Sequence, residues 1–324
     1  MTAPRVYILH ENDAWVEPLR AAFAERDLPY EEWFLHEGVI DLRTAPPEGV
    51  FYNRMSASSH TRDHRYGPEY TAAVLAWLEQ HDRRVLNSGR ALQLEVSKVA
   101  QYAALDVHGI QTPNTVAAVG RDAVVEAARA VEAPFITKHN RAGKGLGVRL
   151  FHDHDALAHY VVSDEFEASV DGITLIQDYI EAPEPFITRV EFIGGRFFYT
   201  VRVDTSQGFE LCPADACRIE DEDAFCPADG ETDSPGLFRI LARAEKPPPD
   251  LITRYEAFLA ANQIHIAGIE FIVDRAGAVW TYDVNTNTNY NSEAEAADGR
   301  SGMGAIAEYL GRELAALHTV GMSA

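Results

Sequence analysis

The sequence has few basic residues, few cysteines and no long apolar run. Lysine and arginine together number 28, against 50 aspartates and glutamates, and the formal net charge is −22. A field of that sign repels nucleic acid, so the sequence argues against a nucleic-acid partner. An anionic small ligand must then be held by local cations or by a metal ion, which makes each cationic cluster informative.

Apolar runs in the sequence stay well short of the ~20 residues that span a bilayer, so we expect no membrane partner. The N-terminus, MTAPRVYILHEND, enters a strand-like run without the basic and apolar regions of a signal peptide, so we expect a cytoplasmic location. The three cysteines all fall in one acidic segment: Cys212, Cys217 and Cys226. Their spacing fits no standard zinc pattern, and the two interpretations are an incomplete metal site and reduced thiols in a loop.

The 324 residues are enough for two or three compact domains. Strand and helix patterns alternate over residues 1–96, which predicts a parallel α/β domain on the substrate side. Residues 97–175 read as a small α+β domain that begins with one helix, expected over 91–109 as ALQLEVSKVAQYAALDVHG. Residues 176–324 read as a third domain with two β-hairpins, and we place the strand ITLIQDYIEA at its start.

The stretch ITKHNRAGKGLGVRLF, residues 136–151, resembles a phosphate-binding loop between two strands. It contains two lysines and three glycines at close spacing: Lys138, Gly143, Lys144, Gly145 and Gly147. It is not the P-loop pattern, because no Ser or Thr follows the Gly-Lys pair and no helix pattern follows the loop. Glycine lets backbone N–H groups approach phosphate closely.

The second expected hairpin, GIEFIVDRAGAVWTYDVN, carries three oxygen-bearing side chains. A turn at DRAG pairs Glu270 close to Asp283, and Asn285 lies two residues further along the same face. Carboxylate and amide oxygens suit Mg²⁺ or Mn²⁺ together with substrate phosphates. A solvated face is the alternative, but the flanking residues are strongly apolar, so we favour a metal site.

Two further stretches suggest substrate recognition. In NTNTNYN, residues 285–291, asparagines alternate, so an extended segment would project Asn287 and Asn289 beside Asn285 and Asn291 as amides for an amino-acid or carboxylate substrate; low-complexity coincidence is the alternative. The stretch NRMSASSHTRDHRYGPEY at the end of an expected strand is rich in cations: Arg54, His60, Arg62, His64 and Arg65. It suits an anionic substrate, or else it is a solvated loop.

Taken in order, these features resemble the ATP-grasp superfamily, and within it the branch of amino-acid and α-L-glutamate ligases. The resemblance covers nearly the whole chain. It rests on Lys98 in EVSKVAQYAAL, on Lys138 with RAGKGLGV, on the hinge-like IQDYIEA, and on GIEF followed by YDVN. It implies an ATP-grasp fold, α/β and α+β, preceded by an N-terminal parallel α/β domain.

The resemblance also implies site roles. Lys98 and Lys138 would contact the α- and β-phosphates of ATP, the glycine loop would cover the β- and γ-phosphates, and Glu270, Asp283 and Asn285 would hold Mg²⁺. Adenine would meet the backbone of the hinge and ribose an acid after it: Gln177, Asp178, Tyr179, Ile180 and Glu184. Arg189 or Arg202, on the first hairpin, would stabilise an oxyanion or the phosphate.

The function implied is an ATP-dependent ligase that forms a peptide or isopeptide bond through an acyl phosphate, with a glutamate-like amino acid as substrate. The alternatives are a small-molecule kinase of the same superfamily, a modifier of a peptide or protein tail, and a non-catalytic nucleotide-binding module. The sequence leaves the acid, the amine and any homo-oligomer open.

Overall fold

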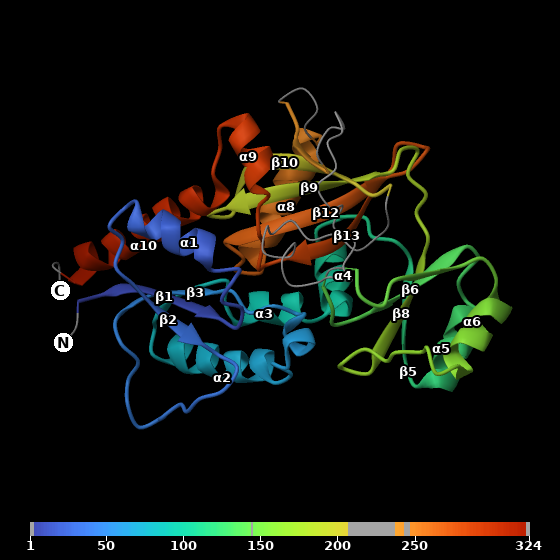
Figure 1. Cartoon of the computed structure of the whole chain (residues 1–324), viewed down its shortest axis with the longest axis horizontal. Coiled ribbons are helices and arrows are strands. Elements are labelled where there is room, and N and C mark those ends of the chain that lie inside the picture. The colour runs from blue at the N-terminus through green and yellow to red at the C-terminus, as the bar shows by residue number, and fades with distance from the viewer. Residues whose placement is uncertain (1–2, 144, 207–236, 243–246, 322–324) are drawn as a thin grey trace.

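In the computed structural model the chain builds three β-sheets that follow one another along the sequence (Figure 1). The structure describes residues 3–143, 145–206, 237–242 and 247–321. The acidic segment with Cys212, Cys217 and Cys226 lies outside these residues, and so does Lys144. Among the described helices, none has both the length and the apolarity needed to cross a bilayer.

The first sheet is parallel, as the alternating pattern predicted, with the order β2-β1-β3-β4. Side chains alternate along β1, so Val6 and Ile8 pack against one layer of helices while Tyr7 and Leu9 pack against another. Figure 1 shows α1 and α10 on one face of this first sheet and α2 on the other face. The elements are β1 (Arg5–His10), α1 (Glu17–Ala24), β2 (Tyr30–Phe34), β3 (Gly49–Asn53), a 3₁₀ turn η1 (Ser59–Arg62), α2 (Gly67–Gln80), β4 (Arg84–Leu86) and, from the chain's end, α10 (Gly302–Gly321).

Two short helices, not the single helix expected over 91–109, lead out of the first sheet. They are α3 (Gly89–Glu95) and α4 (Lys98–Val107). The break lies at Ser97, whose side chain accepts a hydrogen bond from the Ala100 N–H and so caps a new helix. The expectation failed because apolar periodicity continues across the break, while the cap depends on the backbone turning at a single serine.

The second sheet is antiparallel and has the order β5-β8-β6-β7, with two helices packed against it. The sequence analysis placed the strand β8 at the start of the third domain. Its hydrogen bonds to β5 and β6 put it in this second sheet. A domain boundary between residues 175 and 176 would therefore divide β8. The elements are β5 (Thr115–Val119), α5 (Arg121–Ala128), β6 (Phe135–His139), β7 (Arg149–Phe151), α6 (His154–Val162) and β8 (Ile173–Asp178).

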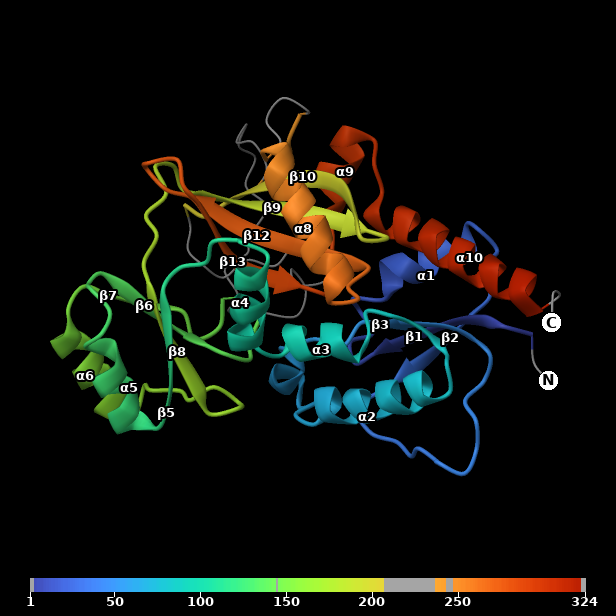
Figure 2. The same ribbon diagram turned by 180° about the vertical axis from the view of Figure 1, so that it is seen from behind.

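The third sheet, β11-β10-β9-β12-β13, contains both predicted hairpins. Gly194 and Gly195 both have positive φ and form the tight turn of the first hairpin. Helix α8 covers one face of the sheet next to α4, which Figure 2 shows from behind. The elements are β9 (Phe186–Ile193), β10 (Arg196–Asp204), β11 (Phe238–Ile240), α8 (Pro249–Ala261), β12 (Ile266–Val273), β13 (Val279–Asn285) and α9 (Ser292–Asp298).

One buried asparagine joins the first sheet to the third. Asn87 follows β4 with a left-handed φ of 57° and no exposed surface. Its amide donates to the carbonyls of Ile266 and Thr286 at 2.9 and 2.7 Å, and its Oδ1 accepts from the N–H groups of His265 and Ile266. A single side chain therefore satisfies backbone groups at the start of β12 and just beyond the end of β13.

We expect Asn87→Ala to lower the free energy of unfolding by about 3 kcal/mol or more, because four hydrogen bonds are lost and their backbone partners stay buried. Urea unfolding measures the change. Asp82→Ala is the matched control, since Asp82 has a similar φ of 54° but is exposed. Equal losses for the two variants would show that backbone conformation, and not the hydrogen bonds, accounts for the effect.

Candidate active site

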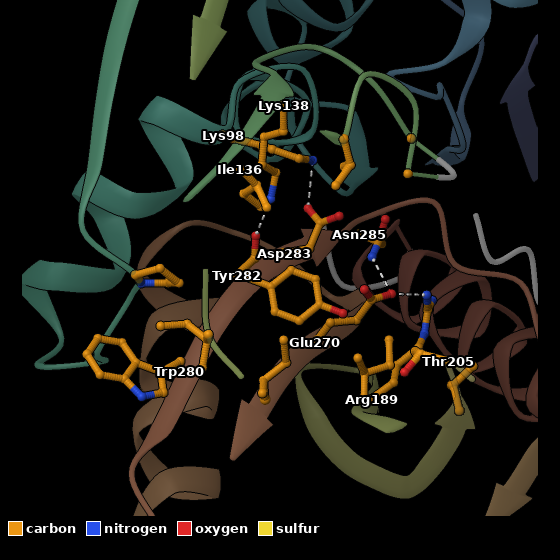
Figure 3. Close-up of a pocket in the computed structure, with 18 of the residues that line it drawn as sticks. Lys98, Ile136, Lys138, Arg189, Thr205, Glu270, Trp280, Tyr282, Asp283 and Asn285 are labelled. Carbon is orange, nitrogen blue, oxygen red and sulfur yellow. Dashed lines mark hydrogen bonds and ion pairs between the residues drawn. The ribbon is translucent and has the colours of Figure 1, made fainter. Parts of the chain in front are cut away.

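A cavity of about 550 Å³ lies between the second and third sheets, with the first domain closing one end. Its walls come from β6, the glycine loop and the segment after β8 on one side, and from β9, β12 and β13 on the other (Figure 3). Most of the site residues singled out in the sequence line this cavity: Lys98, Lys138, Gly143, Gly145, Gln177, Asp178, Tyr179, Ile180, Glu184, Arg189, Glu270, Asp283, Asn285, Asn287 and Asn289.

The two lysines enter the cavity from different elements of the central domain. Lys98 is the first residue of α4, and its Nζ donates to Asp283 Oδ1 at 2.9 Å and to the Ala142 carbonyl at 3.3 Å. Lys138 lies on β6, and its Nζ donates to Tyr102 Oη and to the Tyr282 carbonyl at 3.1 and 3.3 Å. Both ammonium groups are thus held at the acidic strand β13.

Burial and neighbouring charges have opposite effects on the pKa values of Lys138 and Asp283. Burial lowers the pKa of Lys138, although Asp283 and Glu270 pull in the other direction. Burial would raise the pKa of Asp283, but Lys98 and Lys138 hold it below its ordinary value. An incoming polyphosphate would add negative charge beside Lys138 and favour its ammonium form.

The glycine loop reaches across the cavity mouth to the first domain. A Cβ on Gly143 would lie 3.5 Å from the Ser58 Cβ, so the loop and the first domain are in contact distance. Gly145 and Gly147 have φ values of 77° and 73°. Gly147 is not part of the cavity wall, but a Cβ there would lie 2.4 Å from the His139 ring, which itself lines the cavity.

The hinge-like segment forms a continuous part of the wall from Gln177 onward. The Gln177 side chain is buried and donates to Tyr102 Oη and Thr115 Oγ1, so it serves packing. The Asp178 N–H donates to the Asn114 carbonyl at 3.0 Å. Within the described residues the Ile180 N–H has no partner, which leaves it free for a ligand such as adenine. Glu184 lies exposed in the rim of the cavity.

The carboxylate and amide group has the register that the sequence predicted, with Glu270 opposite Asp283. Glu270 Oε1 accepts from Asn285 Nδ2 at 3.2 Å and from Arg189 Nη1 at 2.9 Å. Because Asn285 turns its Nδ2 toward Glu270, its Oδ1 points away from that carboxylate, as Figure 3 shows.

Two carboxylates and one amide oxygen fit a hard cation. No cluster of three or more Asp, Glu, His or Cys side chains that could hold a metal occurs in the described part of the chain. Mg²⁺ typically uses only one or two carboxylates when substrate phosphates complete its coordination. Glu270, Asp283 and Asn285 therefore fit Mg²⁺ as a metal that binds together with phosphate.

The two arginines proposed as catalytic occupy different environments. Arg189 is buried in the cavity wall between Glu191, Glu270 and Thr288, and although burial opposes it, the two carboxylates raise its pKa. A Cβ on Gly268 would lie 2.4 Å from its guanidinium. Arg202 is not among the described residues of the wall; its Cζ lies 3.8 Å from the Phe186 ring centroid, and Phe186 lines the cavity.

The cationic side chains after β3 do not line the cavity. Each of four has an intramolecular partner: Arg54 bonds Asn287 and Asn289, His60 bonds the Ala57 carbonyl, Arg62 pairs with Glu11, and Arg65 pairs with Glu69. None of the four is found among the described wall residues. The fully buried carboxylate of Glu11 explains the position of the Arg62 side chain, because a buried carboxylate needs a cationic partner.

Sequence reasoning missed several wall residues that come from the first domain: Trp15, Ser56, Ser58 and Glu95. Ser56 and Ser58 follow β3 at the carboxyl edge of a parallel sheet, which is the usual place for ligands and could have identified them. Glu95 Oε2 accepts from the Thr286 N–H at 2.7 Å, and burial raises its pKa. Asn291 does not line the cavity with Asn285, Asn287 and Asn289, and its side chain instead caps α9 by accepting a hydrogen bond from the Ala294 N–H.

We expect Gly147→Ala to weaken nucleotide binding by at least about 10-fold, because the new Cβ would displace the loop from His139. Calorimetric titration with Mg-AMPPNP measures this. Gly172→Ala is the matched control, since Gly172 has a φ of 78° but open space around its Cα. Unchanged affinity in Gly147→Ala would remove the glycine loop from the nucleotide site.

No protein-family model and no curated protein sequence matches the chain. Solved structures do match over nearly its whole length. A RimK domain ATP-grasp protein from Sphaerobacter thermophilus is 17% identical, with a TM-score of 0.62, over 94% of this chain and 98% of that one. The ATP-grasp ligase PsnB in complex with a minimal precursor is 15% identical, with a TM-score of 0.65, over 95% and 99%.

D-alanyl-alanine synthetase A from Vibrio cholerae is 13% identical, with a TM-score of 0.61, over 97% of this chain and 99% of that one. PsnB has also been solved with its minimal precursor, Mg and ADP. At these identities the likeness concerns the path of the chain. The chain has the ATP-grasp fold, preceded by a parallel α/β domain.

Proposed function

We propose that this chain is an ATP-dependent ligase that joins a carboxylic acid to an amine, with Mg²⁺ or Mn²⁺ as cofactor. The observation that carries the proposal is the meeting of opposite charges in one cavity: Lys98 and Lys138 from the central domain face Asp283 and Glu270 from the third sheet. The glycine loop closes over the same space. Several solved structures with this fold are named as ligases or synthetases.

The chemistry follows from the poor electrophilicity of a carboxylate. In the proposed reaction the carboxylate oxygen attacks the γ-phosphorus of ATP, ADP leaves, and an acyl phosphate forms. An amine then attacks the acyl carbon, phosphate leaves, and the amine proton is lost to solvent or base. Lys98 and Lys138 would bind phosphate oxygens, and the loop around Gly143 and Gly145 would exclude water from the acyl phosphate.

Glu270, Asp283 and Asn285 would hold the divalent ion, which when bound neutralises charge on the transferring phosphoryl group. Lys98 would then exchange its contact with Asp283 for a phosphate contact. Arg189 keeps Glu270 in place through its 2.9 Å ion pair. We retain Arg202 as a candidate only through its stacking on Phe186 in the wall.

The acid remains to be identified. The glutamate-like preference came from the family resemblance, and the cations after β3, which suited an anionic substrate, are engaged within the protein. We therefore propose a carboxylic acid, with a free amino acid or a peptide as the amine. PsnB was solved with a precursor peptide, so a screen for the amine substrate should include short peptides.

A screen for ADP release over pairs of amino acids and short peptides, with Mg²⁺, tests the proposal. Hydroxylamine is added as a trap, because it converts an acyl phosphate into a stable hydroxamate. Hydroxamate formation supports ligation. ADP release without a hydroxamate indicates phosphorylation of a small molecule, and nucleotide binding without turnover on any pair indicates a non-catalytic module.

We expect Lys138→Met and Glu270→Gln each to lower hydroxamate formation by at least about 100-fold, because each removes a charge that acts on the phosphoryl group. Thermal unfolding should show both variants folded. Glu256→Gln is the control, because Glu256 lies outside this cavity and pairs with the exposed Arg196. Wild-type rates in either site variant would defeat the assignment of these residues.

A further inference from the structure

The side-chain amides of Asn287 and Asn289 are oriented by one buried arginine. Arg54, at the end of β3, donates from Nε to Asn287 Oδ1 at 3.1 Å and from Nη2 to Asn289 Oδ1 at 2.8 Å. A guanidinium can only donate hydrogen bonds, so both amides must turn their oxygens toward it. Their Nδ2 groups then face away from Arg54, and both residues line the cavity.

These two Nδ2 groups have no hydrogen-bond partner in the part of the chain that the structure describes. Within the described residues no hydrogen bond satisfies the Nδ2 of either asparagine, and neither atom is among the enclosed polar atoms that lack partners. Both are therefore open to a ligand. Thr288, between them, points the other way and bonds Glu191 at 2.9 Å, which is the alternation of an extended segment.

Asn285 has the opposite orientation. Its Nδ2 is taken by Glu270, which leaves Oδ1 free for a cation. The asparagine row thus divides into one residue that offers an acceptor and two that offer donors. Donor groups cannot bind a metal ion, so Asn287 and Asn289 are suited to an anion beside the metal.

The positive charge of Arg54 strengthens the preference of this site for an anion. It is 2% exposed, and its partners are neutral: two amide oxygens, the Thr288 carbonyl and the Met303 sulfur. In the described part of the chain no carboxylate forms an ion pair with it. A buried cation without a counter-ion favours an anion nearby, and the amides it polarises lie between it and the cavity.

We propose that Asn287 and Asn289 form a donor pair that binds the carboxylate of the acid substrate, with Arg54 as the positioning residue that fixes both amides. This inference rests on the proposed function and adds to it the place of the acid. It develops the sequence hypothesis that Asn287 and Asn289 bind a carboxylate substrate by adding how their amides are oriented, and it differs from the hypothesis that Arg54 itself would touch an anionic substrate.

The test is calorimetric titration of the full chain with acetate, the simplest carboxylate, with and without saturating Mg-AMPPNP. Asn287→Asp and Asn289→Asp keep an oxygen for Arg54 but replace the donor with a second oxygen. We expect each to weaken acetate binding by at least about 10-fold, since one hydrogen bond is lost and a like charge is added.

Asn291→Asp is the matched control, because among the described contacts the Asn291 side chain uses its Oδ1 alone, as the cap of α9, and aspartate caps equally well. Arg54→Met should weaken acetate binding as much as Asn289→Asp. If Arg54→Met does not fold, the two aspartate variants still decide. A parallel titration with inorganic phosphate distinguishes a carboxylate site from a phosphoryl site.

Acetate binding that is lost in the two site variants and kept in Asn291→Asp supports the inference. Equal acetate affinity in all variants overturns it, as does an absence of acetate binding by the nucleotide-loaded wild type. Loss of phosphate binding with acetate binding retained also overturns it. Failure of the wild type to bind Mg-AMPPNP would defeat the proposed function instead, and the titration without nucleotide would still decide where the carboxylate binds.

Discussion

The ion pair between Lys98 and Asp283, with Nζ and Oδ1 2.9 Å apart, connects the two halves of the cavity. Lys98 opens a helix that leads into the second sheet, and Asp283 lies on a strand of the third. Each charge would be costly if it were buried alone. With Lys138 and Glu270 they form a group in which two cations face two carboxylates, so each buried charge has a counter-charge nearby.

The first domain fixes the acidic strand from the other side. Asn87, Glu95 and Arg54 all reach the segment that follows Val284, and they bond its backbone or its side chains. All three are buried and polar, so their contacts are directional as well as stabilising. The position of the end of β13 therefore depends on one residue after β3, one after β4 and one in α3, all of them far from β13 in the sequence.

Local patterns in the sequence were enough to predict the parallel sheet, both hairpins and the register of Glu270 opposite Asp283. They were also enough to select the two lysines and the carboxylate and amide group of the cavity wall, because packing alone rarely places lysines and acids among apolar residues. Pairings over long distances were not accessible in this way. Arg62 looked available for a substrate because its partner, Glu11, lies 51 residues earlier. The sheet to which β8 belongs is likewise set by β5 and β6, not by its own periodicity.

Gly268 imposes a constraint that extends beyond its own position. Its hydrogen faces the Arg189 guanidinium so closely that a methyl group would overlap it. Any side chain at 268 would push Arg189 off Glu270, and would thereby release the carboxylate that Arg189 holds. A variant with a wider cavity should therefore keep Gly268 and carry its changes at Ser56 or Ser58, which line the cavity from the first domain.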